Sequence, residues 1–241
     1  MTGIPAWLVG CVVLCGLAGL LVPALVARIP QADRQADRQP DLPLRPTYAE
    51  VAARPGLGRR SALAAAVSGG LVGAAVGLDW PLLPLLPLVP VGVALAVVDW
   101  HTHLLPTVVV WPTLGVVVAL GALAAVLGDD LDAFVRALLG MIGVFAFFYL
   151  LWWVHPAGMG FGDVRLSAVL GFALGYVGWP ELLLGIYGGF LAFSVPGLAL
   201  TVVRRDRDLL RTAFPFGPFL LVGALGGLVL GGPLWSHLVA G

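Results

Sequence analysis

The chain has 241 residues, of which 60% are hydrophobic and only 11% charged, and its formal net charge at pH 7 is zero. A soluble domain of this composition would expose large apolar patches, so the composition indicates a membrane protein. The sequence has neither an excess of basic residues nor a basic stripe with interleaved aromatic side chains, which excludes nucleic acid as a partner.

Eight apolar segments approach the length of about 20 residues that a helix needs to cross the hydrocarbon core. The first lacks a basic n-region and an A-x-A-like cleavage site, so we expect it to be retained rather than removed as a signal peptide. The third contains four prolines and is expected to be kinked or partly unwound. The segments run over residues 5–29, 61–78, 81–98, 104–127, 133–154, 164–179, 181–203 and 214–239.

The arginines predict the orientation of these segments, because cytoplasmic loops carry the positive excess. Arginines lie in the loop 30–60, at Arg165 and in the loop 204–211, whereas the charged residues of the opposite loops are all acidic. Arg136 lies inside the fifth segment, where an i, i+4 pair with Asp132 explains it. We therefore predict an all-α polytopic membrane protein with about eight transmembrane helices and both termini outside, forming a single membrane-embedded domain over 1–241.

Residues 30–60 differ in composition from the rest of the chain. A tandem ADRQ at 32–35 and 36–39 is followed by a Pro-rich stretch. Such a segment cannot bury enough apolar surface to fold by itself, so it is predicted to be a flexible cytoplasmic loop.

Two aspartates stand apart from the loop acids. Asp99 closes the third segment in VVDWHTHLLP, and Asp163 opens the sixth in GMGFGDVRL. An ionisable group at or near the bilayer is a candidate functional residue, and the arginines place both on the cytoplasmic side. Two neighbouring carboxylates share a proton, which is how aspartic proteases obtain an acid and a base from one residue type. The simpler alternative for Asp163 is a helix N-cap.

The motifs around these aspartates resemble the type IV prepilin peptidases, which belong to the group of proteases marked by a GxGD sequence. Gly160-Phe161-Gly162-Asp163 matches that motif, and Gly158 extends it to G-x-G-x-G-D. The family's other aspartate precedes an LP element, as Asp99 here precedes Leu105-Pro106. Thr107 stands where the family usually has an acid after LP.

The resemblance implies an aspartic endopeptidase of the bacterial cytoplasmic (inner) membrane. Its substrate would be a prepilin or pseudopilin precursor whose basic leader is removed after a Gly at the cytoplasmic face. Asp99 and Asp163 would be catalytic, and no cofactor is implied. Substrate-positioning roles are expected for Gly158, Gly160, Gly162, His101, His103 and Pro106.

Larger members of the family carry a zinc-binding domain with paired CxxC motifs and also N-methylate the mature pilin with S-adenosylmethionine. This chain has no CxxC motif. We therefore predict peptidase activity without a zinc module, and we do not assign the methyltransferase activity.

Three other functions are alternatives for these residues. A metal site is not predicted, because His101 and His103 lack the H-E-x-x-H spacing and the two cysteines lie four residues apart in an apolar run. A proton- or cation-coupled transporter could use the same two aspartates. An inactive pilus-assembly scaffold is the third possibility, and the oligomeric state is left open.

Overall fold

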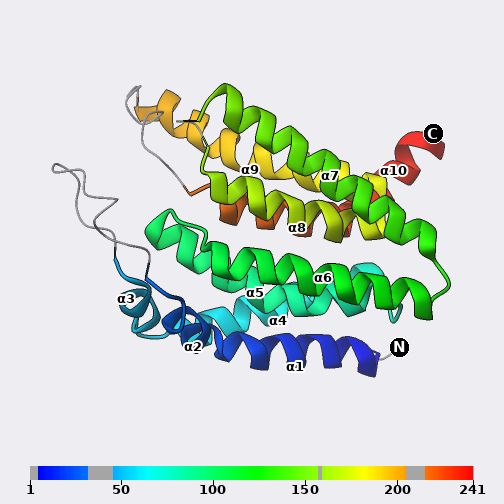
Figure 1. Cartoon of the computed structure of the whole chain (residues 1–241), viewed down its shortest axis with the longest axis horizontal. Coiled ribbons are helices and arrows are strands. Elements are labelled where there is room, and N and C mark those ends of the chain that lie inside the picture. The colour runs from blue at the N-terminus through cyan, green and yellow to red at the C-terminus, as the bar shows by residue number, and fades with distance from the viewer. Residues whose placement is uncertain (1–4, 32–45, 157–158, 205–214, 241) are drawn as a thin grey trace.

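The computed structural model describes residues 5–31, 46–156, 159–204 and 215–240, and the regular structure in these ranges is entirely helical (Figure 1). The all-α prediction is therefore confirmed for the described part of the chain. The helices are α1 (Ala6–Leu20), α2 (Val22–Ala27), α3 (Tyr48–Ala52), α4 (Leu57–Val76), α5 (Leu82–Thr102), α6 (Thr107–Leu127), α7 (Leu131–Val154), α8 (Phe161–Val177), α9 (Trp179–Arg204) and α10 (Gly217–Ala240).

Each of the eight expected segments contains a helix, but not all of these helices qualify as membrane spans by length and composition. Within the described residues, five do so: Ala6–Ala27, α5, α6, α7 and Gly217–Leu238. Helix α8 has 17 residues, fewer than the roughly 20 that a span requires, and α4 has two arginines in its first turn. The count of eight spans remains a prediction.

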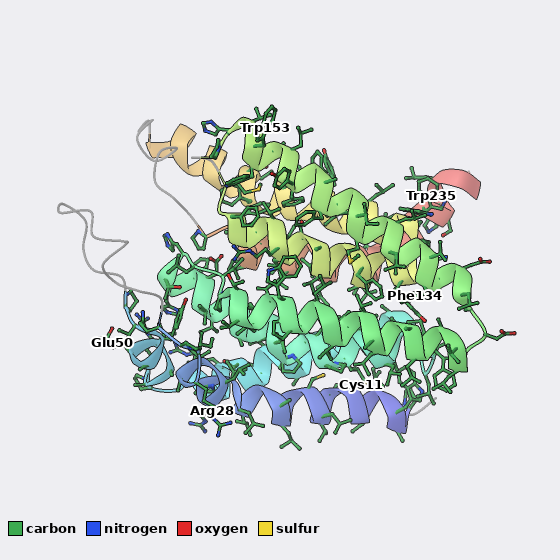
Figure 2. The ribbon with its side chains drawn as sticks, viewed as in Figure 1. Cys11, Arg28, Glu50, Phe134, Trp153 and Trp235 are labelled. Atoms are coloured by element: carbon green, nitrogen blue, oxygen red, sulfur yellow. The ribbon has the colours of Figure 1, made fainter. Side chains whose placement is uncertain are left out.

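The long helices lie side by side along one common axis and form an antiparallel bundle (Figure 1). The two ends of the chain lie at the same end of this bundle. At the opposite end, Figure 2 shows Arg28, Glu50 and Trp153. Trp235 lies toward the end that carries the termini, so tryptophans occur near both ends, as is typical of the two membrane interfaces.

Helix α5 contains most of the prolines of the expected third segment. Pro81 is its N-cap and Pro84 lies in its first turn. The N–H groups of a first turn have no partner within the helix, so proline removes no hydrogen bond there. The helix continues through Pro87 and Pro90 to Thr102. The partial unwinding considered for this segment does not occur.

Helix α8 is the central helix of the bundle, since every residue from Leu166 to Tyr176 is buried. It packs closely on α7 through glycines: a methyl group added at Gly171 would lie 2.8 Å from the carbonyl oxygen of Gly140.

The partners of Arg136 are not the expected Asp132 but residues of α8. Its guanidinium donates to the carbonyl oxygens of the last turn of α8 and so caps the C-terminus of that helix. The acceptors are Gly175 (2.8 Å), Tyr176 (2.8 Å) and Val177 (3.2 Å).

The C-terminal part of the expected flexible loop 30–60 is helical. Helix α3 is stabilised by a capping box between Thr47 and Glu50. Its buried side chains, Tyr48 and Val51, pack with residues of α2 and with Val98 near the end of α5. The two ADRQ repeats extend over 32–39 and lie outside the described residues.

Helices α9 and α10 approach so closely that glycine is required where they cross. A methyl group at Gly223 would lie 2.7 Å from the carbonyl oxygen of Gly185 and closer still to the backbone of Gly189. By contrast, Gly226 on the same helix has no atom within 4 Å of its Cβ position. The α9–α10 contact therefore depends on small residues on one face of α10.

We expect Gly223→Ala to lower the free energy of unfolding by about 1–3 kcal/mol, because the two backbones must move apart to admit the methyl group. Gly226→Ala is the matched control and should leave it nearly unchanged. Unfolding of the purified protein in mixed micelles, followed by circular dichroism, measures both. Equal stability of the two variants would contradict the close helix contact.

Candidate active site

Asp99 lies in the last turn of α5 and is only 4% exposed. Its Oδ2 accepts a hydrogen bond of 3.0 Å from the backbone N–H of Gly217. Gly217 is the first residue of α10, where N–H groups have no helical partner and the helix dipole is positive. A Cβ at this position would lie 2.8 Å from the same oxygen, so glycine allows α10 to begin directly against the carboxylate.

Asp163 lies in the first turn of α8 and is 7% exposed. The helix begins at Phe161 with Gly160 as its N-cap, so the alternative of Asp163 as the N-cap is wrong. Its Oδ2 faces the backbone amide of Gly160. Its Oδ1 is buried and has no hydrogen-bond partner among the described residues. A buried carboxylate oxygen without a partner is rare in a structural role and is available to a reacting group.

The fold brings the two aspartates together around Leu105, in the turn between α5 and α6. A methyl group at Gly162 would lie 2.7 Å from Leu105 Cβ, and one at Gly217 would lie 3.5 Å from Leu105 Cδ1. The carboxylates are near enough that the charge of Asp99 acts on Asp163. Figure 1 shows the corresponding helix ends, the C-terminus of α5 and the N-termini of α8 and α10, at one end of the bundle.

The glycines expected to position substrate lead directly into Asp163. Gly160 is the exposed N-cap of α8, and Gly162 packs against Leu105, as described above. Gly158 lies outside the described residues. The structure thus explains Gly162 by close packing, whereas contact of these glycines with substrate remains a prediction.

Arg165 connects the first turn of α8 to the start of α6. Its guanidinium donates to Thr107 Oγ1 and lies over the ring of Phe161, with 4.7 Å between the guanidinium carbon and the ring centroid. Thr107, which occupies the position of the family's acid, is therefore the neutral acceptor for this arginine. The contact holds the start of α8, which carries Asp163, against the start of α6.

The remaining predicted residues surround this turn in different ways. His101 directs Nδ1 back along its own helix and donates to the carbonyl oxygen of Val97 at 2.8 Å. His103 is the exposed C-cap of α5, in the left-handed conformation with φ of 54°. Pro106 is the buried N-cap of α6. Their contact with substrate remains a prediction.

A metal site is not formed by the described residues, where no three His, Cys, Asp or Glu side chains come close enough to hold an ion. Cys11 and Cys15 are free and buried, and glycines of α4 pack against them. Figure 2 shows Cys11 on α1, well away from the end of the bundle that carries the two aspartates.

Gly217 is the site residue that sequence reasoning missed. The signal for it is the motif Pro-Phe-Gly-Pro at 215–218, since glycine before a proline marks the start of a helix whose first N–H groups are free. Nothing in the sequence indicates that this helix start would meet Asp99, because 118 residues separate the two positions.

These features define a helical membrane protein with two buried carboxylates at adjoining helix ends. The chain belongs to the type IV leader peptidase family, whose model matches residues 86–202, a range that includes both aspartates. It is similar to the prepilin leader peptidase/N-methyltransferase of Dickeya chrysanthemi, with 34% identity over 155 residues that cover 60% of this chain and 50% of the relative.

Two further relatives extend the comparison. A prepilin leader peptidase/N-methyltransferase of Pseudomonas aeruginosa is 33% identical over 162 residues, covering 66% of this chain and 53% of the relative. Leader peptidase HopD of Escherichia coli is 32% identical over 117 residues, covering 46% of this chain and 68% of the relative. The chain thus spans about half the length of the prepilin leader peptidase/N-methyltransferases it matches. No solved structure matches it significantly.

Proposed function

We propose that this protein is an aspartic endopeptidase of the bacterial cytoplasmic (inner) membrane that removes the basic leader from prepilin or pseudopilin precursors, after a Gly. The observation that carries the proposal is the juxtaposition of two buried aspartates, Asp99 from the end of α5 and Asp163 from the start of α8. Both lie within the residues matched by the leader peptidase family.

The chemistry is water-mediated hydrolysis of a peptide bond without a covalent intermediate. One carboxylate takes a proton from the attacking water, while the other, in its protonated form, donates to the carbonyl oxygen of the scissile bond. Collapse of the tetrahedral intermediate then transfers a proton to the leaving amine. Two carboxylates held close together in a buried site share a proton, so that one is an acid while the other is a base.

The surroundings of the pair support these roles. The N–H of Gly217 holds one oxygen of Asp99 in place, and the positive end of α10 favours negative charge there. Asp163 keeps Oδ1 without a partner among the described residues, so this oxygen is the one we assign to the water or the scissile carbonyl.

Cleavage is proposed to take place at the cytoplasmic face. Arg28 lies at the same end of the bundle as the helix ends that carry the aspartates (Figure 2). Other arginines add to the positive charge at this end. They are Arg54, which precedes α4, Arg59 and Arg60 in the first turn of α4, and Arg165 near the start of α8. Positive residues concentrate on the cytoplasmic side of membrane proteins.

The proposal covers peptidase activity alone. The names of the relatives from Dickeya chrysanthemi and Pseudomonas aeruginosa include an N-methyltransferase, but those proteins are about twice as long as the part this chain matches. The two carboxylates supply an acid and a base for hydrolysis, and neither assists transfer of a methyl group in an evident way.

The test is co-expression of the chain with a prepilin whose basic leader ends in Gly, followed by mass spectrometry of the product N-terminus. We expect a single cut directly after that Gly, and none in a prepilin in which the Gly is replaced by Val. An uncut precursor with the folded, membrane-inserted protein would contradict the proposal. It would favour the scaffold, or the proton- or cation-coupled transporter if a proton flux were found.

A further inference from the structure

A groove of about 590 Å³ lies between α4 and α10 and reaches the last turn of α5, which carries Asp99. Helix α5 forms its floor, and its contributing residues recur at spacings of three and four, which places them on one face of that helix. Leu170, Ala173 and Leu174 of α8 close its inner side. The α5 residues are Leu85, Leu88, Val89, Gly92, Val93, Ala96, Val97, Trp100 and His101.

The groove is long, and most of the residues that line it are apolar. From Leu85 to His101, α5 extends by about 24 Å at 1.5 Å per residue, which is most of the thickness of the hydrocarbon core. Some of the residues that line it are exposed, among them Trp100 at 55% and Val222 at 63%, so the groove is open to the outside of the bundle. Its dimensions fit one face of an apolar helix.

Polar groups gather at one end of the groove. Arg60 and His101 line this end, and none of the described residues that line the groove is acidic. Ser61 also lines it, and its hydroxyl is buried, with 2% of the residue exposed, and has no hydrogen-bond partner among the described residues. This end therefore complements an occupant that presents a hydrogen-bonding group and a negative rather than a positive charge.

The polar end lies at the helix turns that hold Asp99. Trp100 and His101 of the groove follow Asp99 directly in the chain, and Pro218 follows Gly217, whose N–H holds Asp99. A chain that leaves the groove at this end therefore emerges beside the last turn of α5 and the first turn of α10, which hold Asp99. A lipid would satisfy the apolar walls but would gain nothing from this proximity.

We propose that the groove between α4, α5 and α10 binds the apolar helix of the precursor, with the helix's acidic or neutral polar end at Arg60 and His101. The inference rests on the proposed function, which supplies the precursor, and it adds the surface that recognises it. The basic leader then lies beyond the carboxylates, away from Arg60, since two positive charges side by side would repel. Binding the helix in this groove fixes the register at which the chain crosses the two aspartates.

Photocrosslinking tests occupancy without requiring cleavage. We place p-benzoylphenylalanine at Val93 on the groove floor, or at Val116, a 52% exposed residue of α6 outside the groove, in an Asp163→Asn background that retains uncut prepilin. A crosslink to prepilin from position 93 and not from position 116 is expected. Equal crosslinking from both positions, or crosslinks from position 93 to lipid alone, would overturn the proposal.

A pair of charge reversals tests the polar end. Arg60→Glu and Arg59→Glu make the same change at neighbouring exposed positions, but only Arg60 lines the groove. For a prepilin with its apolar helix, we expect Arg60→Glu to raise KM about tenfold and Arg59→Glu to leave it unchanged. A short peptide that spans the cleavage site but lacks the helix should not distinguish the two variants. The same KM for both variants with the full precursor would refute the assignment.

The two proposals fail in different ways. If the wild-type protein cleaves prepilin but position 93 gives no specific crosslink, the groove assignment is wrong and the peptidase function stands. If position 93 crosslinks to prepilin but the wild type cleaves nothing, the groove binds the precursor and the proposed chemistry is wrong.

Discussion

Replacing either Asp99 or Asp163 by asparagine is expected to reduce prepilin cleavage by at least about 10³-fold, because each variant removes the acid or the base from the pair. Asparagine keeps the size of the side chain, so the helix ends around Leu105 retain their packing. The measurement is kcat/KM for purified enzyme with prepilin in detergent micelles, with the cut position read by mass spectrometry.

Asp132→Asn is the matched control for these two variants. Asp132 is exposed in the first turn of α7, and the same substitution there should leave kcat/KM within about twofold of the wild type. Thermal unfolding of all three variants separates loss of catalysis from loss of folding. Cleavage retained in either Asp99→Asn or Asp163→Asn would eliminate the two-carboxylate mechanism.

Gly217→Ala is expected to lower kcat about a hundredfold, since displacement of a catalytic group by about 1 Å has an effect of this size. The new methyl group would lie 2.8 Å from Asp99 Oδ2, so either the carboxylate rotates or the start of α10 moves away. The backbone N–H is still present in this variant, and only its distance from Asp99 changes. We expect KM to change little, because Gly217 is not one of the residues that line the groove.

Gly226→Ala serves as the control on the same helix. No atom lies within 4 Å of the Cβ position of Gly226, so this variant should keep wild-type kcat and KM. Gly217→Ala with wild-type kcat would show that the hydrogen bond to Asp99 has no role in catalysis. A loss in both variants would point to the helix as a whole rather than to its first residue.

The helices were predictable because each depends on a local property of the sequence. An apolar stretch of about 20 residues in a bilayer must satisfy its own backbone hydrogen bonds, so it forms a helix whatever its neighbours are. This argument found every long helix, including α5 with its three prolines. It did not find α3, since five residues with one capping box are stabilised mainly by the packing of Tyr48 and Val51.

The two aspartates were also identified from the sequence, as charged residues at the ends of apolar segments within a family motif. Their catalytic role was not decided by that motif and remains a proposal. The expected pair of Arg136 with Asp132 shows the limit of local reasoning. The i, i+4 spacing allows such a contact, but three carbonyl groups at the end of α8 provide better acceptors from a distant part of the chain.

The sequence by itself thus determined that this is an all-helical membrane protein with two aspartates at helix ends, because hydrophobic length and charge placement are properties of single segments. Only the tertiary structure decided that Gly217 donates to Asp99, that Leu105 packs against both Gly162 and Gly217, and that α4, α5 and α10 enclose a groove that ends at the last turn of α5. These features arise where segments far apart in the chain meet, and their geometry depends on how closely glycine faces allow helices to approach.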